Sequence, residues 1–337
     1  MPDLSIEITN ACNRDCIHCL RDKLEPREHL SLDIFIEILD HAKNYGITHI
    51  SLTGGEPTLH PSWSDLLIAL SERKLKFNFV SNGSLFKQKA LPALSVPIVK
   101  RHLESVCLSL DGASEKSHDT LRGKKSFTEV VDAANLCRLK GLPLSFKTVV
   151  TNANKRELTE IALLGSNLGA KQHSFLTLFP TPRLLEDDLI PSLIETRKIY
   201  SFITGSILPS IKTEIIMEGS WGSDSALFNC NAYQQSYSVD HLGNLIFCCN
   251  LSHVYNGEKT LIMGKEVLGS VIEDFKKCII SHYELLSQFT TDRLNGKSVS
   301  DCLYPYPCLW CHNYFGKLRW IENISNSPWT KELFSEH

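Results

Sequence analysis

Apolar and polar positions in the first 180 residues alternate between two spacings. Short apolar runs predict strands, and after each run apolar residues recur three and four positions apart, as on one face of a helix. The predicted strands are 4–9, 49–52, 77–81, 105–110, 144–150 and 172–178, and helices are predicted at 32–42, 63–73, 127–140 and 155–168. This alternation predicts an α/β fold in which a parallel sheet with right-handed crossovers forms a partial, TIM-like (β/α)6 barrel.

Polar residues and glycines mark the expected helix ends. Ser31 should cap the helix that begins at residue 32, and Gly46 should stop it. Gly141 should end the helix at 127–140. Asn154, with Glu157 three residues later, forms a capping-box-like pair at the start of the helix at 155–168.

The strand and helix rhythm stops near residue 180. A proline-containing loop at 181–188, a helix at 192–202 and an extended piece at 212–217 follow. From Trp221 onward turns and cysteines dominate, which predicts a small, loop-rich domain held by metal rather than by a core of its own. We therefore expect a barrel domain, a cysteine-rich domain and a tail, at 1–220, 221–325 and 326–337.

Composition and charge exclude several classes of protein. Apolar residues make up 42% of the 337 residues, but no run approaches the roughly 18 that span a bilayer, and no signal peptide is visible. We expect a cytoplasmic protein that does not bind membranes. The net charge is -3 and basic residues are dispersed, so nucleic acid is not an expected partner.

Cysteine is the residue type that carries the chemistry. Twelve cysteines in a reducing compartment indicate metal ligation rather than disulfides. Three lie near the N-terminus, two in the middle and seven after residue 229, which indicates two separate metal sites. The positions are 12, 16, 19, 107, 137, 230, 248, 249, 278, 302, 308 and 311.

The first group, Cys12, Cys16 and Cys19, follows directly on the first predicted strand and so lies at the mouth of the predicted barrel. Three thiolates can hold three irons of a 4Fe-4S cluster and leave the fourth iron open to another ligand. A structural zinc site is the alternative, but it needs four ligands. His18 is an awkward fourth ligand because it is adjacent to Cys19.

These residues resemble the C-x-x-x-C-x-aromatic-C signature of the radical S-adenosylmethionine (SAM) superfamily, with His18 at the aromatic position. The resemblance implies that the open iron binds the amino and carboxyl groups of SAM. It also implies that an electron from the cluster cleaves SAM to methionine and a 5'-deoxyadenosyl radical.

Further residues match motifs of that superfamily. Gly54, Gly55 and Glu56 resemble its GGEP motif, which binds the SAM amino group, and the glycines let backbone groups approach a ligand closely. By the same resemblance Ser109 would face the SAM ribose or carboxylate. A polar residue that merely ends a strand is an equally good explanation of Ser109. Arg122 would face the carboxylate, which suits a cation.

The second group of cysteines resembles the C-terminal extension called SPASM or, in its shorter form, twitch. Cys230, twelve residues, Gly243, four residues and Cys248 match its opening pattern, and residues 237–248 read as a hairpin that brings the two cysteines together. The full form needs the pattern C-x-x-C-x5-C-x3-C and seven cysteines for two clusters, whereas the end of this chain offers Cys302, Cys308 and Cys311 and no cysteine beyond them. The resemblance therefore favours one auxiliary 4Fe-4S cluster, on Cys230, Cys248, Cys308 and Cys311.

Three other cysteines have open roles. Cys249 is a rival for Cys248, Cys302 is a fifth candidate ligand or an unligated thiol, and Cys278 sits at a helical spacing that favours a buried thiol. The alternative for the whole region is a zinc ribbon on the same four thiols.

The resemblance implies hydrogen-atom abstraction from a substrate. Most enzymes with this extension modify ribosomally made peptides, by crosslinking, epimerisation or oxidation, and we expect the same here. Oxidation or dehydrogenation of a small alcohol or aminocyclitol is the alternative, and a non-catalytic zinc or iron-sulfur module a distant one. The expected partners are an electron donor such as flavodoxin or ferredoxin and, because the first predicted strand begins at Leu4, a separate peptide-recognition protein.

Overall fold

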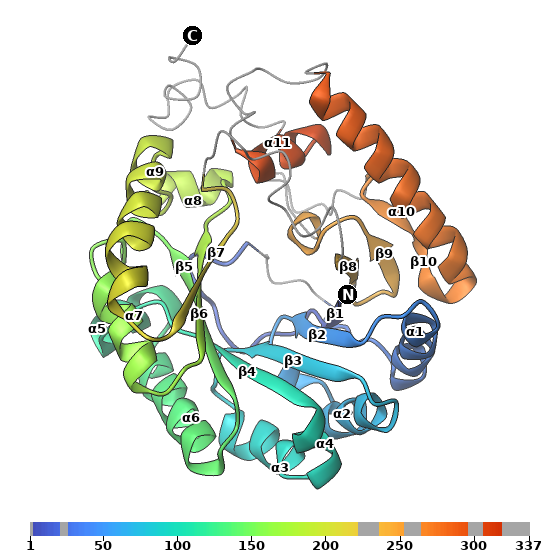
Figure 1. The fold of residues 1–337 in the computed structure, drawn as a ribbon, viewed down its shortest axis with the longest axis horizontal. Helices are drawn as coiled ribbons and strands as arrows, with labels where there is room; N and C mark the ends of the chain where they lie inside the picture. The colour runs from blue at the N-terminus through green and yellow to red at the C-terminus, as the bar shows by residue number, and fades with distance from the viewer. Residues whose placement is uncertain (1–2, 21–25, 222–235, 253–263, 296–305, 319–337) are drawn as a thin grey trace.

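The computed structural model describes residues 3–20, 26–221, 236–252, 264–295 and 306–318, and its centre is one ten-stranded sheet. The strand order is β10-β9-β8-β1-β2-β3-β4-β5-β6-β7 (Figure 1). The strands are β1 Asp3–Thr9, β2 His49–Gly54, β3 Lys76–Ser81, β4 Leu103–Ser109, β5 Leu144–Val150, β6 Gln172–Thr177, β7 Glu214–Glu218, β8 Ser236–Val239, β9 Asn244–Ile246 and β10 Val267–Ser270.

Helices cover the outer side of this curved sheet, except that the last of them lies at its open side (Figure 1). They are α1 Leu32–Asn44, α2 Trp63–Glu72, α3 Leu91–Leu94, α4 Pro97–His102, α5 Glu115–Arg122, α6 Ser126–Lys140, α7 Leu158–Asn167, α8 Pro182–Glu186, α9 Leu193–Phe202, α10 Val271–Leu294 and α11 Pro307–Tyr314. Strands β1 to β7 pair in parallel with their neighbours, and no pairing in the described ranges closes the sheet. The predicted partial barrel is therefore confirmed.

Alternation along the strands separates an apolar outer face from a polar inner face. In β1, Leu4, Ile6 and Ile8 are fully buried in the core that includes the helices, whereas the residues between them are polar. Inner-face side chains bond to each other across strands: the Ser51 hydroxyl donates to the Asn78 side chain at 2.7 Å. The inner face of the sheet thus carries polar side chains that hydrogen-bond to each other.

The structure confirms two of the predicted helix ends and corrects a third. The Ser31 hydroxyl accepts from the Ile34 amide at 3.2 Å at the start of α1, and Gly141 ends α6 in the left-handed conformation. The prediction that Asn154 caps a helix at 155–168 is wrong. The buried Asn154 amide instead donates to the main-chain oxygen of Asp111, and α7 begins at Leu158.

The predicted hairpin is present, and it also extends the sheet of the barrel. Strands β8 and β9 pair antiparallel around a turn in which Gly243 has a φ of +83°. Strand β8 also pairs in parallel with β1, so the hairpin continues the barrel sheet beyond its first strand. The extended piece at 212–217 becomes β7, the seventh parallel strand. The domain boundary at residue 220 stays a prediction.

The cysteine-rich region was expected to be held by metal rather than by a core of its own, and its described part shares a hydrophobic core with the barrel. Aromatic side chains of the β9 end, α10 and α11 pack into a second hydrophobic cluster together with Leu121 and Leu178 from the barrel. The aromatic members from this region are Phe247, Phe289, Tyr306, Trp310 and Phe315. None of the described helices is long and apolar enough to cross a membrane.

Candidate active site

The three N-terminal cysteines lie on one loop, between the end of β1 and α1. Cys12, Cys16 and Cys19 are each partly exposed, and the Cys19 amide donates to the Cys16 carbonyl at 3.1 Å. Segments far along the chain hold this loop: the Ile17 amide donates to the Leu121 carbonyl at 3.0 Å, and the Arg183 guanidinium donates to the Cys19 carbonyl at 2.8 Å. The loop therefore has a fixed place at the carboxyl end of the parallel strands.

The donor set of this loop fits a 4Fe-4S cluster. Among the described residues, no three Cys, His, Asp or Glu side chains converge as ligands of a single metal ion. A cubane cluster takes one thiolate per iron, so its ligands need not converge on one ion. Burial raises the pKa of the Cys16 thiol to about 11, while Arg122 opposes that rise. A positive charge thus lies beside the thiols, where it favours their thiolate forms.

Gly54 and Gly55 bring the loop after β2 against the backbone of the cysteine loop. The Gly55 amide donates to the Thr9 carbonyl, and the Glu56 amide to the Ala11 carbonyl, both at 2.8 Å. A Cβ added at Gly54 would lie 2.2 Å from the Thr9 oxygen, and one at Gly55 would lie 2.1 Å from the Ala11 oxygen. The close approach that these glycines allow in the structure is to the cysteine loop itself.

We predict that Gly55→Ala displaces the cysteine loop. The added methyl cannot coexist with the Ala11 carbonyl, so the loop must shift, at a cost of about 1 to 3 kcal/mol in the free energy of unfolding. Iron content after anaerobic reconstitution should fall with it. Gly205→Ala is the matched control, because a Cβ at Gly205 meets nothing within 4 Å. Equal iron content in the two variants would contradict this prediction.

Glu56 connects the ends of β2 and β3 through its buried carboxylate. Oε1 accepts from the hydroxyls of Thr58 at 2.7 Å and Ser81 at 2.8 Å and, more weakly, from the Thr58 amide, while Oε2 accepts from the Asn82 amide at 2.8 Å. Burial raises the pKa of Glu56, and these hydrogen bonds oppose the rise. Oε2 thus accepts one described bond, and a carboxylate oxygen can accept a second.

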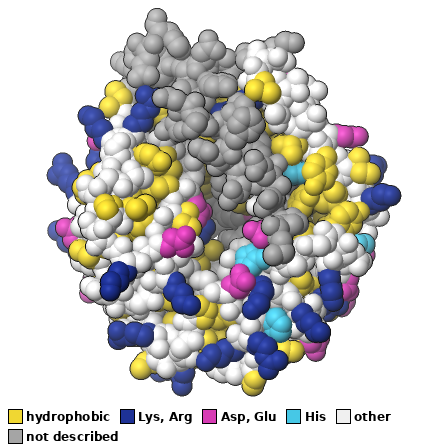
Figure 2. All heavy atoms as spheres, in the orientation of Figure 1, with side chains coloured by type: hydrophobic (Ala, Val, Ile, Leu, Met, Phe, Trp, Pro, Cys, Tyr) yellow, Lys and Arg dark blue, Asp and Glu magenta, His cyan; other side chains and the backbone are white. Residues whose placement is uncertain are grey.

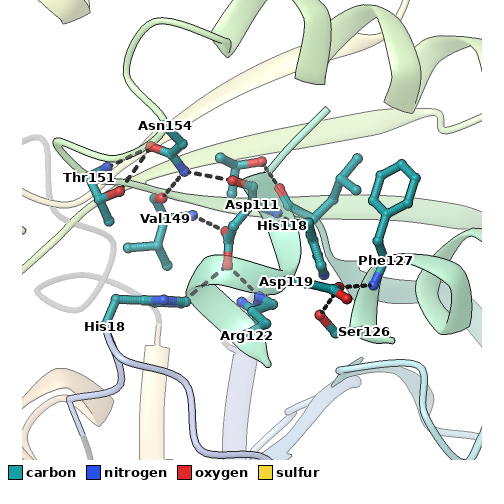
Figure 3. Close-up of polar contacts among 12 residues, drawn as sticks. His18, Asp111, His118, Asp119, Arg122, Ser126, Phe127, Val149, Thr151 and Asn154 are labelled. Atoms are coloured by element: carbon teal, nitrogen blue, oxygen red, sulfur yellow. Dashed lines mark hydrogen bonds and ion pairs between the residues drawn. The ribbon is translucent and has the colours of Figure 1, made fainter. Parts of the chain in front are cut away.

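The segment after β4 places a buried carboxylate against the cysteine loop (Figure 3). Asp111 Oδ2 lies 3.2 Å from Nε2 of His18 and forms an ion pair with Nε of Arg122, at the end of α5. Ser109, at the end of β4, is 7% exposed. The predicted ligand Arg122 thus lies beside the thiols with a counterion that sequence reasoning missed. The available signal was an aspartate directly after a predicted strand.

The second group of cysteines is described in part. Cys248 follows β9, and Cys308 and Cys311 lie three residues apart on α11, a spacing that puts them on one face of the helix. All three are partly exposed, and Cys248 and Cys311 border the second hydrophobic cluster. Cys230 and Cys302 lie outside the described residues, so the predicted ligand set stays a prediction.

The open roles of the other cysteines are partly resolved. Cys278 is buried in α10, and its thiol donates to the Ser270 carbonyl at 3.3 Å, which confirms the expected buried thiol. Cys107 and Cys137 are buried as well. Cys249 is exposed at the start of the turn that follows β9, next to Cys248.

Comparison with known proteins gives consistent matches. The chain matches the Radical SAM superfamily over residues 6–165. The mycofactocin maturase MftC of Mycolicibacterium smegmatis is 28% identical over 254 residues, which are 73% of this chain and 63% of MftC. The sporulation killing factor maturation protein SkfB of Bacillus subtilis is 29% identical over 170 residues, 49% of this chain and 40% of SkfB. The chain thus spans less than two thirds of these relatives' lengths.

Solved structures agree with the fold. Streptococcus suis SuiB bound to S-adenosylmethionine superposes with a TM-score of 0.69 at 19% identity, over 89% of this chain and 69% of SuiB. The enzyme anSMEcpe with bound AdoMet and the Kp18Cys peptide gives 0.66 at 16% identity, over 96% and 98% of the two chains. The cysteine loop and the adjoining glycines lie within the matched residues 6–165, which thus form a radical SAM domain, and members of that superfamily use SAM and a 4Fe-4S cluster.

Proposed function

We propose that this enzyme cleaves SAM reductively on a cluster held by Cys12, Cys16 and Cys19 and abstracts a hydrogen atom from a peptide made on the ribosome. The bound cluster supplies the electron that converts SAM to methionine and a 5'-deoxyadenosyl radical. The observation that carries the proposal is the attachment of the cysteine loop to the loop after β2 by two 2.8 Å backbone hydrogen bonds. This attachment puts the thiols and the GGEP-like segment in one site.

The residues around the thiols have separate tasks in this proposal. Glu56 offers a carboxylate oxygen to the SAM ammonium, since Oε2 has room for a second donor. Arg122 offers its guanidinium to the SAM carboxylate, and the Ser109 hydroxyl contacts the ribose or the same carboxylate.

A peptide substrate is supported by the relatives. MftC is named as a maturase and SkfB as a maturation protein, and SuiB has been seen with the precursor peptide SuiA.

We further propose that Cys230, Cys248, Cys308 and Cys311 hold an auxiliary 4Fe-4S cluster. Four thiolates would satisfy every iron, so this cluster has no open position and would accept the substrate electron or support the fold. The placement of Cys308 and Cys311 on one face of α11, beside the cluster of apolar residues that also contains Cys248, supports this ligand set.

The test is anaerobic reconstitution followed by reduction with dithionite or a reduced flavodoxin. The enzyme should convert SAM to 5'-deoxyadenosine, and with a candidate precursor peptide it should change the mass of that peptide. Turnover of a small alcohol or aminocyclitol, with no peptide product, would replace the peptide part of the proposal. Iron binding with no 5'-deoxyadenosine at all would overturn it.

We predict that Glu56→Gln and Arg122→Ala weaken SAM binding while the cluster stays in place. Each variant loses a charge-assisted contact with one end of the methionine moiety, worth about 1.5 to 3 kcal/mol, so the dissociation constant should rise roughly ten- to a hundredfold. Equilibrium titration of reconstituted protein with SAM measures this effect. Ordinary SAM affinity at normal iron content would show that the residue does not contact SAM.

A further inference from the structure

The carboxylate of Asp111 is fully buried, and hydrogen bonds to its side chain and to its backbone fix its position (Figure 3). Oδ1 accepts from the Val149 amide at 2.8 Å. The Asp111 amide donates to Nδ1 of His118 at 3.1 Å, and its carbonyl accepts from the Asn154 amide group at 3.0 Å. These contacts come from α5, β5 and the loop after β5, so the direction of Oδ2 is determined by three separate segments.

Oδ2 of Asp111 lies beside two side chains of the proposed cluster site. One is His18, which lies between Cys16 and Cys19 on the cysteine loop. The other is Arg122, whose Nε pairs with Oδ2. Burial disfavours the charged form of Asp111, but Arg122 and then His18 hold the pKa of the carboxyl well below its ordinary value. Asp111 is therefore a charged partner for both groups.

The pairing geometry leaves part of the guanidinium for another anion. Arg122 uses Nε toward Asp111, and no described contact is formed by its two terminal nitrogens. A guanidinium with five donors can bind a second carboxylate through these nitrogens while Nε stays engaged. The ion pair with Asp111 thus fixes the plane in which Arg122 presents its remaining donors.

We propose that Asp111 is a positioning residue for SAM cleavage, which it serves by orienting Arg122 toward the SAM carboxylate and by holding the cysteine loop through His18. This inference rests on the proposed function, because it assigns Arg122 a ligand that belongs to that function. Asp111 itself contacts neither the thiols nor, in this proposal, SAM.

The two links can be separated by substitution. In Asp111→Asn the side-chain oxygen can still accept from Val149, and the new amide donor can bond to Nε2 of His18. Nδ1 of His18 has no hydrogen-bond partner among the described residues and can carry the proton instead. The same amide donor would face the Nε–H of Arg122, which is also a donor. The ion pair between residue 111 and Arg122 is therefore lost. Asp111→Ala removes both links.

The experiment compares iron content and SAM affinity in reconstituted wild-type protein, Asp111→Asn and Asp111→Ala. Asp111→Asn should keep the iron and raise the SAM dissociation constant about ten- to a hundredfold, as is typical when a supporting partner of a ligand is removed. It should also weaken the change that SAM causes in the EPR spectrum of the reduced cluster. Asp111→Ala should lose iron as well.

Asp119→Asn is the matched control, since Asp119 lies on the same helix and accepts from Ser126 and Phe127 at the start of α6. It should lower stability at most and leave SAM affinity unchanged. A second control is Arg122→Met: if Asp111 acts through Arg122, adding Asp111→Asn to Arg122→Met should raise the dissociation constant no further.

The outcomes distinguish this inference from the proposed function. Wild-type protein that makes 5'-deoxyadenosine, together with an Asp111→Asn variant of unchanged SAM affinity, would overturn the role of Asp111 alone. Equal losses in Asp111→Asn and Asp119→Asn, or additive losses in the double variant, would also overturn it, because they indicate a general structural role. Wild-type protein that does not cleave SAM would instead overturn the proposed function.

Discussion

Replacement of Cys12, Cys16 or Cys19 by alanine should abolish 5'-deoxyadenosine formation. Each thiolate would ligate a different iron, so the loss of one leaves too few ligands for a stable cluster. Product formation in the three single variants should fall below detection, measured by chromatography after reduction of reconstituted protein.

The control for these variants is Cys137→Ala. Cys137 is buried in α6 and behaves as a small apolar side chain, so its replacement should keep SAM cleavage even if it lowers stability. Iron content should fall in the three loop variants and stay normal in the control. Undiminished cleavage in all three loop variants would contradict the assignment of the cluster.

The position of the cysteine loop could be predicted from the sequence, because the pattern that indicates it is local. The spacing of Cys12, Cys16 and Cys19 lies within eight residues, and the strand before it follows from alternating apolar positions. Strand β5 has the bounds that this alternation predicts. Local patterns of this kind hold when the tertiary environment does not override them.

Contacts between distant segments explain what could not be predicted. Asn154 has the chemistry of a helix cap, yet its amide group bonds to Asp111, which lies 43 residues earlier. His18 reaches that same aspartate from the cysteine loop. No local pattern encodes such partners, because a polar side chain bonds to whichever group the fold places beside it.

The same limit explains why the core that the C-terminal region shares with the barrel could not be predicted. Its aromatic residues are scattered among turns and cysteines, and no periodic pattern shows that they meet. In the structure α11 brings Trp310 against Phe289 of α10, with ring centroids 4.9 Å apart, and Phe247 also packs on Phe289. The core is assembled from segments that lie far apart in the sequence, including barrel residues between 121 and 193, so only the tertiary structure reveals it.

The second large effect concerns the proposed auxiliary cluster. Wild-type protein should hold about eight irons per chain, and the double variant Cys308→Ala, Cys311→Ala about four, because each 4Fe-4S cluster assembles or is lost as a unit. The double variant should still make 5'-deoxyadenosine, since Cys12, Cys16 and Cys19 lie on a different loop, but it should lose turnover of the true substrate. Iron analysis and product assays on the same preparation measure both effects.

Two features of the structure make this test sharp. The aromatic cluster around Trp310 packs α11 against α10, so the double variant should stay folded, which circular dichroism and gel filtration check. Cys249→Ala is the matched control, because Cys249 is exposed beside Cys248 and would leave the iron content at about eight if Cys248 is the ligand. A drop to about four irons in that variant would transfer the ligand role to Cys249.

Wild-type protein with only about four irons and one tightly bound zinc would show a zinc module in place of the auxiliary cluster, since the same four thiolates can hold either.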